Sequence, residues 1–99
     1  MITVRKEGEQ ITISGHALYA PVGEDIVCAG VSALVQGFIA SMDDLGASYV
    51  IKEDCKIMII KIKSDTTDVK LLTRSFFIGL SLIEREYPDY IRCPCVERR

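Results

Sequence analysis

The chain has 99 residues, of which 48% are hydrophobic and 26% are charged, with 3 prolines. This length indicates one domain over residues 1–99, and the composition excludes disordered and collagen-like chains, because so apolar a chain can bury enough surface to offset its ordering entropy. The 12 basic and 14 acidic residues give a net charge of -2, so the basic excess typical of nucleic-acid-binding proteins is missing and no direct nucleic-acid partner is expected.

The first half of the chain predicts a hairpin followed by a helix. Met1–Glu7 and Gln10–Ser14 alternate polar and apolar residues as strands do, with a Gly-Glu turn between them. The helix begins near Glu24 or Asp25, because a helix amino end favours negative charge, and ends by Gly46. Its apolar residues recur every three or four positions and are expected to face a core: Val27, Val31, Leu34, Phe38 and Met42.

The second half repeats this order with different residues. Ser48–Lys52 and Cys55–Lys63 have the composition of strands, and Ser64–Thr67 supplies caps for a second helix that stops before Pro88. Tyr90–Val96 is expected to form a short edge strand, where a proline is tolerated. The apolar face of the second helix is expected to contain Val69, Leu72, Phe76, Leu80, Ile83 and Tyr87.

The element order ββαββα(β) predicts an α+β fold with an antiparallel or mixed sheet and two helices on one face. The segment Ile57–Ile62 is nearly continuous in apolar residues. Such strands are typically buried on both faces. We therefore expect the helices to cover one face of this strand and a second subunit to cover the other.

The sequence favours a cytoplasmic protein. Its longest run without a charged residue or glutamine, Ile26–Val35, is too short to cross a bilayer. Charged residues follow Met1 within a few positions, which is unlike a secretory signal. In a reducing compartment the four cysteines are expected to be free thiols.

The single histidine and one cysteine form a candidate catalytic pair. His16 follows a predicted strand, and Cys28 falls in the first turn of the predicted helix. A helix amino end and a histidinium both lower the pKa of a thiol, and the thiolate is the nucleophile. A loop of this length can bring the two side chains together for acyl transfer. Spacing alone equally fits a small buried Cys28 and a His16 on a surface loop.

Three further residues are candidates for supporting roles. Gly15 allows close approach of the backbone beside the histidine. Asp25 could orient His16 or simply cap the helix, and it lies next to the thiol. Ser32 is four residues after Cys28 and therefore on the same side of the helix, where it could support the thiol or serve as a small residue at a helix contact.

The segments Gly15-His16-Ala17 and Gly23–Leu34 resemble the signature of the ribosomal-processing cysteine protease family, Prp. The resemblance implies a cytoplasmic, homodimeric endopeptidase without a cofactor. It also implies a substrate: the N-terminal extension of large-subunit ribosomal protein number twenty-seven. On this resemblance Cys28 is the nucleophile and His16 the general acid and base, while Gly15, Asp25 and Ser32 match the other motif positions. The loop 17–23 then shapes the substrate site.

Two other interpretations stay open. A non-enzymatic, dimeric, ribosome-associated binding module on the same fold would use Cys28 only for packing. Cys93 and Cys95, with Cys55, could bind zinc or act as a redox pair, although structural zinc sites show wider ligand spacing, so no metal site is expected. The lysines at 52, 56, 61, 63 and 70 are expected to keep strand edges soluble rather than to bind RNA.

Overall fold

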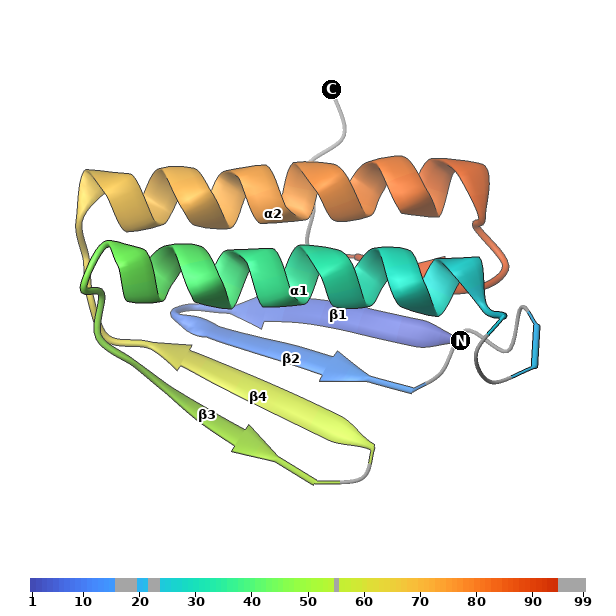
Figure 1. Cartoon of the computed structure of the whole chain (residues 1–99), viewed down its shortest axis with the longest axis horizontal. Coiled ribbons are helices and arrows are strands. Elements are labelled where there is room, and N and C mark those ends of the chain that lie inside the picture. Colours follow the sequence, from blue (N-terminus) through green and yellow to red (C-terminus); the bar gives the residue numbers. More distant parts are fainter. Residues whose placement is uncertain (16–19, 22–23, 55, 95–99) are drawn as a thin grey trace.

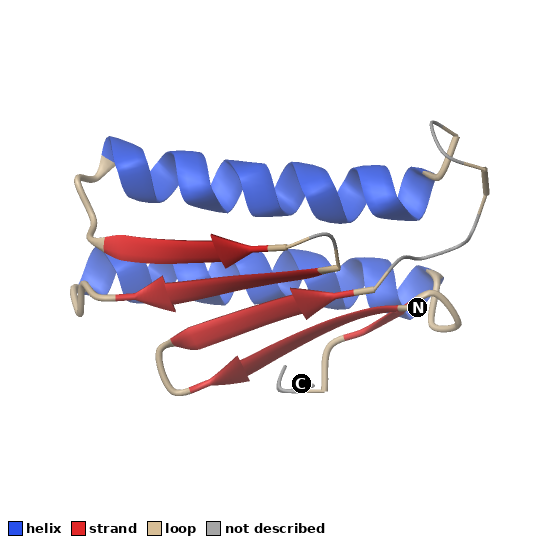
Figure 2. Ribbon diagram, turned by 90° about the horizontal axis from the view of Figure 1, so that it is seen from below, coloured by secondary structure: helices blue, strands red, loops and turns tan. Residues whose placement is uncertain are grey.

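The computed structural model describes residues 1–15, 20–21, 24–54 and 56–94. Within them, two helices lie side by side on one face of a five-stranded sheet (Figures 1 and 2). The predicted order of elements and the α+β class are confirmed. The elements are β1 (Ile2–Glu7), β2 (Gln10–Ser14), α1 (Ile26–Asp44), β3 (Tyr49–Glu53), β4 (Ile57–Ile62), α2 (Thr67–Glu86) and β5 (Ile91–Arg92).

The sheet is mixed, with strand order β3-β4-β2-β1-β5. β1, β2, β4 and β3 pair antiparallel with their neighbours, while β5 pairs parallel with β1. The predicted edge strand over 90–96 is shorter than expected. Only Ile91 and Arg92 pair, opposite Ile2 and Thr3. The pairing ends there because the Cys93 N–H donates to Glu84 and Pro94 has no N–H. Residues 95 and 96 lie outside the described residues.

Side chains cap the amino ends of both helices. Asp25 Oδ1 accepts a hydrogen bond from the Cys28 N–H at 2.9 Å, and Thr66 Oγ1 accepts one from the Val69 N–H at 3.2 Å. These caps satisfy backbone donors that have no partner inside the helix. At the carboxyl end of α1, Gly46 takes a positive φ of 68°, as predicted for a helix stop.

The core lies between the helix layer and the sheet. The rings of Phe38 in α1 and Phe76 in α2 are stacked with their centroids 4.8 Å apart, which joins the two helices. A Cβ at Gly79 would come within 3.0 Å of the Leu34 side chain, so the helices approach closely there. The core residues on the strands are Ile2, Val4, Ile11, Ile60, Ile62 and Ile91, and those on α1 are Val27, Val31, Val35, Phe38 and Met42.

One buried charged side chain links α2 to the last strand. Glu84 is buried, and its Oε2 accepts a hydrogen bond from the Cys93 N–H at 3.1 Å. Cys93 itself has no exposed surface. A buried carboxylate is tolerated where it is hydrogen-bonded, so this contact positions the chain after β5 against the carboxyl end of α2.

β4 is less buried than its sequence predicts. Ile60 and Ile62 face the helices and are buried, as expected. On the opposite face Ile57 is 40% exposed, while Ile59 and Lys61 are half-buried. The helices cover one face of the strand, as expected, and no element of the described residues covers the second face of the sheet. Cover of that face by a second subunit stays a prediction.

α1 is apolar on more than its core-facing side. By length and mean hydropathy, 1.6, it passes the criteria for a membrane-spanning helix, although only 28% of the tested window is buried. Core helices of globular proteins pass the same test, and the inward side of α1 packs on the sheet. The outward side of α1 is apolar as well but exposed, since Ala29, Ala33, Gly37 and Ala40 lie there.

Candidate active site

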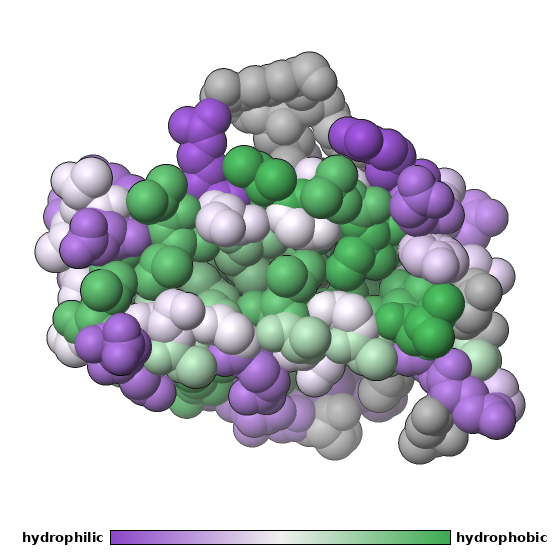
Figure 3. All heavy atoms as spheres, turned by 45° about the horizontal axis from the view of Figure 1, so that its top comes forward, coloured by the Kyte–Doolittle hydropathy of each residue, from purple (hydrophilic) through white to green (hydrophobic). Residues whose placement is uncertain are grey.

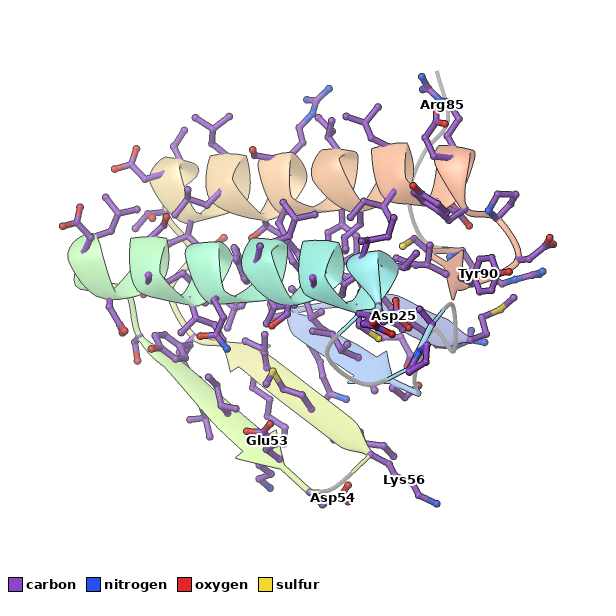
Figure 4. All side chains as sticks on the ribbon, turned by 45° about the vertical axis from the view of Figure 1, so that its right-hand side comes forward. Asp25, Glu53, Asp54, Lys56, Arg85 and Tyr90 are labelled. Carbon is purple, nitrogen blue, oxygen red and sulfur yellow. The ribbon has the colours of Figure 1, made fainter. Side chains whose placement is uncertain are left out.

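The amino end of α1 holds two of the predicted site residues together. Asp25 is the N-cap, with an extended backbone (φ -80°, ψ 100°), and its carbonyl oxygen accepts the first helical hydrogen bond, from Ala29 at 3.0 Å. Its side chain binds the backbone N–H of Cys28 (Figure 4 labels Asp25). Of the two roles considered for Asp25, the described residues show that of the helix cap.

Cys28 lies in the first turn of α1. It is half-buried and packs against the edge of the core, and its thiol is free. No acidic residue lies in this first turn. A carboxylate at this helix end is that of the N-cap, Asp25, which accepts a hydrogen bond from the Cys28 backbone N–H.

Two backbone donors at this helix end are unused. Within the part of the chain that the structure describes, the N–H groups of Ile26 and Val27 make no hydrogen bond. The third N–H, that of Cys28, is taken by Asp25. Free donors at a helix amino end can hold a negatively charged oxygen.

Gly15 ends β2 in a conformation that requires glycine. Its φ is +83°, and a Cβ on it would lie 2.2 Å from the Met1 carbonyl oxygen. Its N–H donates to the Lys56 carbonyl oxygen at 3.3 Å. The chain directly before His16 is therefore fixed between the amino terminus and the β3–β4 turn.

The turn between β3 and β4 holds Gly15 in place, a role that the sequence analysis did not predict. Asp54 Oδ1 accepts hydrogen bonds from the N–H groups of Lys56, at 2.9 Å, and Ile57, at 3.0 Å. Figure 4 shows Glu53, Asp54 and Lys56 at this tip of the sheet. An aspartate before a turn is a recognisable signal, but its link to Gly15 depends on the pairing of β2 with β4, which no local pattern reveals.

The remaining predicted residues are only partly described. Ser32 lies one turn after Cys28 on α1 and is exposed. His16 lies outside the described residues, as does loop 17–23 except Ala20 and Pro21. The end of β2 and the start of α1, which flank this segment, lie at the same end of the molecule (Figures 1 and 2).

The metal interpretation finds no support in the residues that the structure describes. Among them, no group of three or more His, Cys, Asp or Glu side chains could hold an ion. Cys55 and Cys95, which that interpretation also needs, lie outside this part of the chain.

Sequence comparison identifies the family. The family model described as Cysteine protease Prp matches residues 1–92. The chain belongs to the Prp family of cysteine proteases. It is 30% identical to the ribosomal processing cysteine protease Prp of Mycoplasma pneumoniae, over 92% of this chain and 91% of the relative. The Prp of Staphylococcus aureus strain Mu50 is 29% identical, with 92% of each chain covered.

Solved Prp structures share the fold. A crystal structure of the S. aureus protease with a covalently linked product peptide has a TM-score of 0.86 and 29% identity, over 94% of this chain and 97% of that one. A second, with a substrate peptide, has a TM-score of 0.76 and 25% identity, over 93% and 94%. The chain is thus a ribosomal processing cysteine protease.

Proposed function

We propose that this protease removes the N-terminal extension of large-subunit ribosomal protein number twenty-seven in the bacterial cytoplasm. The S. aureus structures contain a substrate peptide and a covalently linked product peptide, which supports peptide hydrolysis through a covalent intermediate. The observation that carries the proposal is the placement of Cys28 in the capped first turn of α1, within a chain that matches the family over 1–92.

In this mechanism the Cys28 thiolate attacks the scissile carbonyl carbon. The N–H groups of Ile26 and Val27 stabilise the developing oxyanion, since Asp25 already accepts from the Cys28 N–H. His16 protonates the leaving amine, the C–N bond breaks, and a thioester forms. His16 then takes a proton from water, and the hydroxide attacks the thioester, breaks the C–S bond and releases the carboxylic acid and the Cys28 thiolate beside a protonated His16.

The other motif residues position this pair. Asp25 fixes the first turn of α1 and with it the backbone of the nucleophile. Gly15 permits the tight path of the chain immediately before His16. Ser32, exposed one turn beyond Cys28, is available to a bound peptide. Polar groups beside a nucleophile commonly fix the substrate in a reactive orientation.

Mass spectrometry of a peptide that spans the extension junction tests this function. The wild type should cleave it, Cys28→Ala should lower the rate by at least about a thousand-fold, and His16→Ala by about a hundred-fold or more. Cys93→Ala, which alters a buried thiol far along the sequence, is the matched control and should still cleave.

One outcome would favour the alternative of a binding module. If the wild type binds the peptide but leaves it intact, and Cys28→Ala binds equally well, then Cys28 is a packing residue. Cleavage at another peptide bond by the wild type, with the same loss in both variants, would keep the mechanism and change the substrate.

We also propose that the protease is a homodimer. The exposed apolar residues of the single chain support this proposal, because they occur on both the helix layer and the sheet.

A further inference from the structure

The open face of the sheet is the side that no helix among the described residues covers (Figure 2). Successive residues of a strand point to opposite faces. The buried positions of each strand, such as Val4 in β1 and Ile60 in β4, face the helices, so their neighbours along the chain lie on the open face. The charged residues there are Arg5, Glu7, Lys52, Lys61 and Arg92.

This face is basic although the whole chain is acidic. It holds four basic residues and one acidic residue, whereas the chain has 12 basic and 14 acidic ones. The other positions of the chain thus hold eight basic against thirteen acidic residues. The net charge of -2 indicates no nucleic-acid partner, but it averages over surfaces of opposite sign. A polyanion responds to the local field of the surface that it meets.

The register of the sheet arranges the four basic residues as a band. One row of opposite residues runs from Arg5 on β1, across β2 and β4, to Lys52 on β3. Arg92 lies beyond this row on β5, and Lys61 lies beside it on β4. Neighbouring strands are about 4.8 Å apart, so a band that crosses five strands is about 19 Å wide. A band of this width suits successive phosphates of a nucleic-acid strand better than a single small anion.

The four basic side chains are available to a partner. Arg5, Lys52 and Arg92 are exposed, and Lys61 is half-buried. None of them forms an ion pair or a side-chain hydrogen bond within the described part of the chain. On β1 and β2 the uncharged residues of this face are hydrogen-bonding ones: Thr3, Gln10, Thr12 and Ser14. Basic side chains beside hydroxyls and amides are the groups that contact phosphate and sugar oxygens.

The helix layer on the other side of the molecule has a different character. Leu71 is 66% exposed, and Ile78 and Leu82 are each 50% exposed. Figure 3 shows hydrophobic side chains gathered over this layer, with hydrophilic ones at its border. On the open sheet face, by contrast, the apolar residues are confined to β3 and β4, as Val50, Ile57 and Ile59. The sheet is therefore the side of the molecule that suits an anionic partner.

We propose that the open face of the sheet binds RNA through its phosphate backbone. A ribosomal processing protease meets its substrates beside ribosomal RNA, so RNA is the polyanion that fits both the charge of the face and the family. The proposal replaces the second subunit that the apolar residues of β4 predict on this face. A two-fold contact would bring two positively charged faces together, and like charges across an interface oppose binding.

Spacing along the chain does not reveal this surface. Lys52 and Lys61 were expected only to keep strand edges soluble, and nothing local places them near Arg5 or Arg92. The pairing of β3 with β4, β4 with β2, and β1 with β5 puts all four on one face. The face then serves as a docking surface, separate from the cleavage of the peptide itself.

Fluorescence anisotropy of a labelled single-stranded RNA of about 20 nucleotides tests the proposal. With four phosphate contacts, the dissociation constant of the wild type should rise about 50-fold between about 50 and 200 mM salt. Arg5→Gln combined with Lys61→Gln removes two contacts. This double variant should bind at least about ten-fold more weakly at the lower salt concentration, and its salt-dependent rise should be only about seven-fold.

A second double variant is the matched control. Lys70→Gln combined with Arg74→Gln also removes one lysine and one arginine, both exposed, but from α2 on the other side of the molecule. It has the same net charge as the sheet variant and should bind the RNA about as tightly as the wild type. Circular dichroism spectra equal to that of the wild type show that both variants fold.

Several results would overturn the proposal. One is a wild type that does not bind the RNA at the lower salt concentration, and another is equal weakening by both double variants, which would reduce the attraction to net charge. Displacement of the RNA by polyglutamate at equal charge concentration would assign the face to an acidic protein. A halved mass of the sheet variant alone would assign it to a second copy.

Cleavage of the free junction peptide separates this proposal from the proposed function. None of the four replaced residues belongs to the catalytic site, so both double variants should cleave the free peptide at the wild-type rate. A wild type that cleaves the peptide but does not bind RNA keeps the proposed function and overturns the docking surface. One that binds RNA but leaves the peptide intact does the reverse.

Discussion

The two helices have the same kind of amino-terminal cap, but the residues that the caps hold have different surroundings. Asp25 caps α1 through the N–H of Cys28, and Thr66 caps α2 through the N–H of Val69. Val69 is buried in the core, whereas Cys28 is half-buried at its edge with a free thiol. One capping geometry thus fixes a core residue in α2 and a half-buried free cysteine in α1.

Their first turns also differ in charge. α2 has Asp68 in its first turn, the usual complement to the positive end of a helix dipole. α1 has no acidic residue there. In α1 a carboxylate at the helix end belongs instead to the N-cap, Asp25, which accepts a hydrogen bond from the Cys28 N–H. The two helices thus place a negative charge near the positive end of their dipoles from different positions.

The largest expected effect comes from the backbone directly before His16. Gly15→Ala would place a methyl group 2.2 Å from the Met1 carbonyl oxygen at a φ of +83°. We expect a loss of about 3 kcal/mol of stability in urea unfolding, from the clash and the left-handed strain together.

Gly8→Ala is the control for that strain. Gly8 also has a positive φ, 60°, but its Cβ would meet nothing within 4 Å. Its cost should be only about 1 kcal/mol. Equal losses for the two variants would show that close approach to Met1 does not matter.

Removal of either helix cap should have an intermediate effect on stability, and it tests most directly how the two helix starts differ. Asp25→Ala and Thr66→Ala should each lower the free energy of unfolding by about 1 kcal/mol. Only Asp25→Ala should also lower kcat for the junction peptide, by about ten-fold or more, because the Cys28 backbone loses its anchor. Asp25→Asn, which keeps a capping oxygen, should recover most of the rate. Similar kcat losses in both alanine variants would make the cap at Asp25 merely structural.

The smallest effect lies at the other end of α1. The Tyr49 hydroxyl donates a hydrogen bond to Asp43 Oδ1, and this bond raises the pKa of the Tyr49 phenol above 10.0, with smaller contributions from burial and the carboxylate charge. The difference in absorbance between wild type and Tyr49→Phe should therefore report ionisation above pH 10.0. In Asp43→Ala the midpoint should fall, while peptide cleavage stays unchanged because the site lies at the opposite end of the helix.

Much of the fold could be predicted because its signals are local. The first helix start was predicted near Glu24 or Asp25, and Asp25 is the cap. The second followed from the run Ser64–Thr67, where Thr66 provides the cap. The inward stripe of α1 followed from its spacing, although Leu34 is only partly buried and lies close to Gly79 of α2. The motif around Cys28 led to the family, and the match over residues 1–92 confirmed it. The catalytic role of Cys28 and of His16 stays a prediction.

The amino-acid sequence by itself determined the elements, their inward faces and the family, because periodicity, caps and a contiguous motif act over a few residues. Only the tertiary structure decided that Gly15 meets both Met1 and Lys56, that β5 joins β1, and that β4 leaves Ile57 exposed. These contacts join residues far apart in the chain, and their geometry depends on how the whole sheet packs. The same packing left several large apolar residues of α2 exposed, which the spacing of residues alone could not decide.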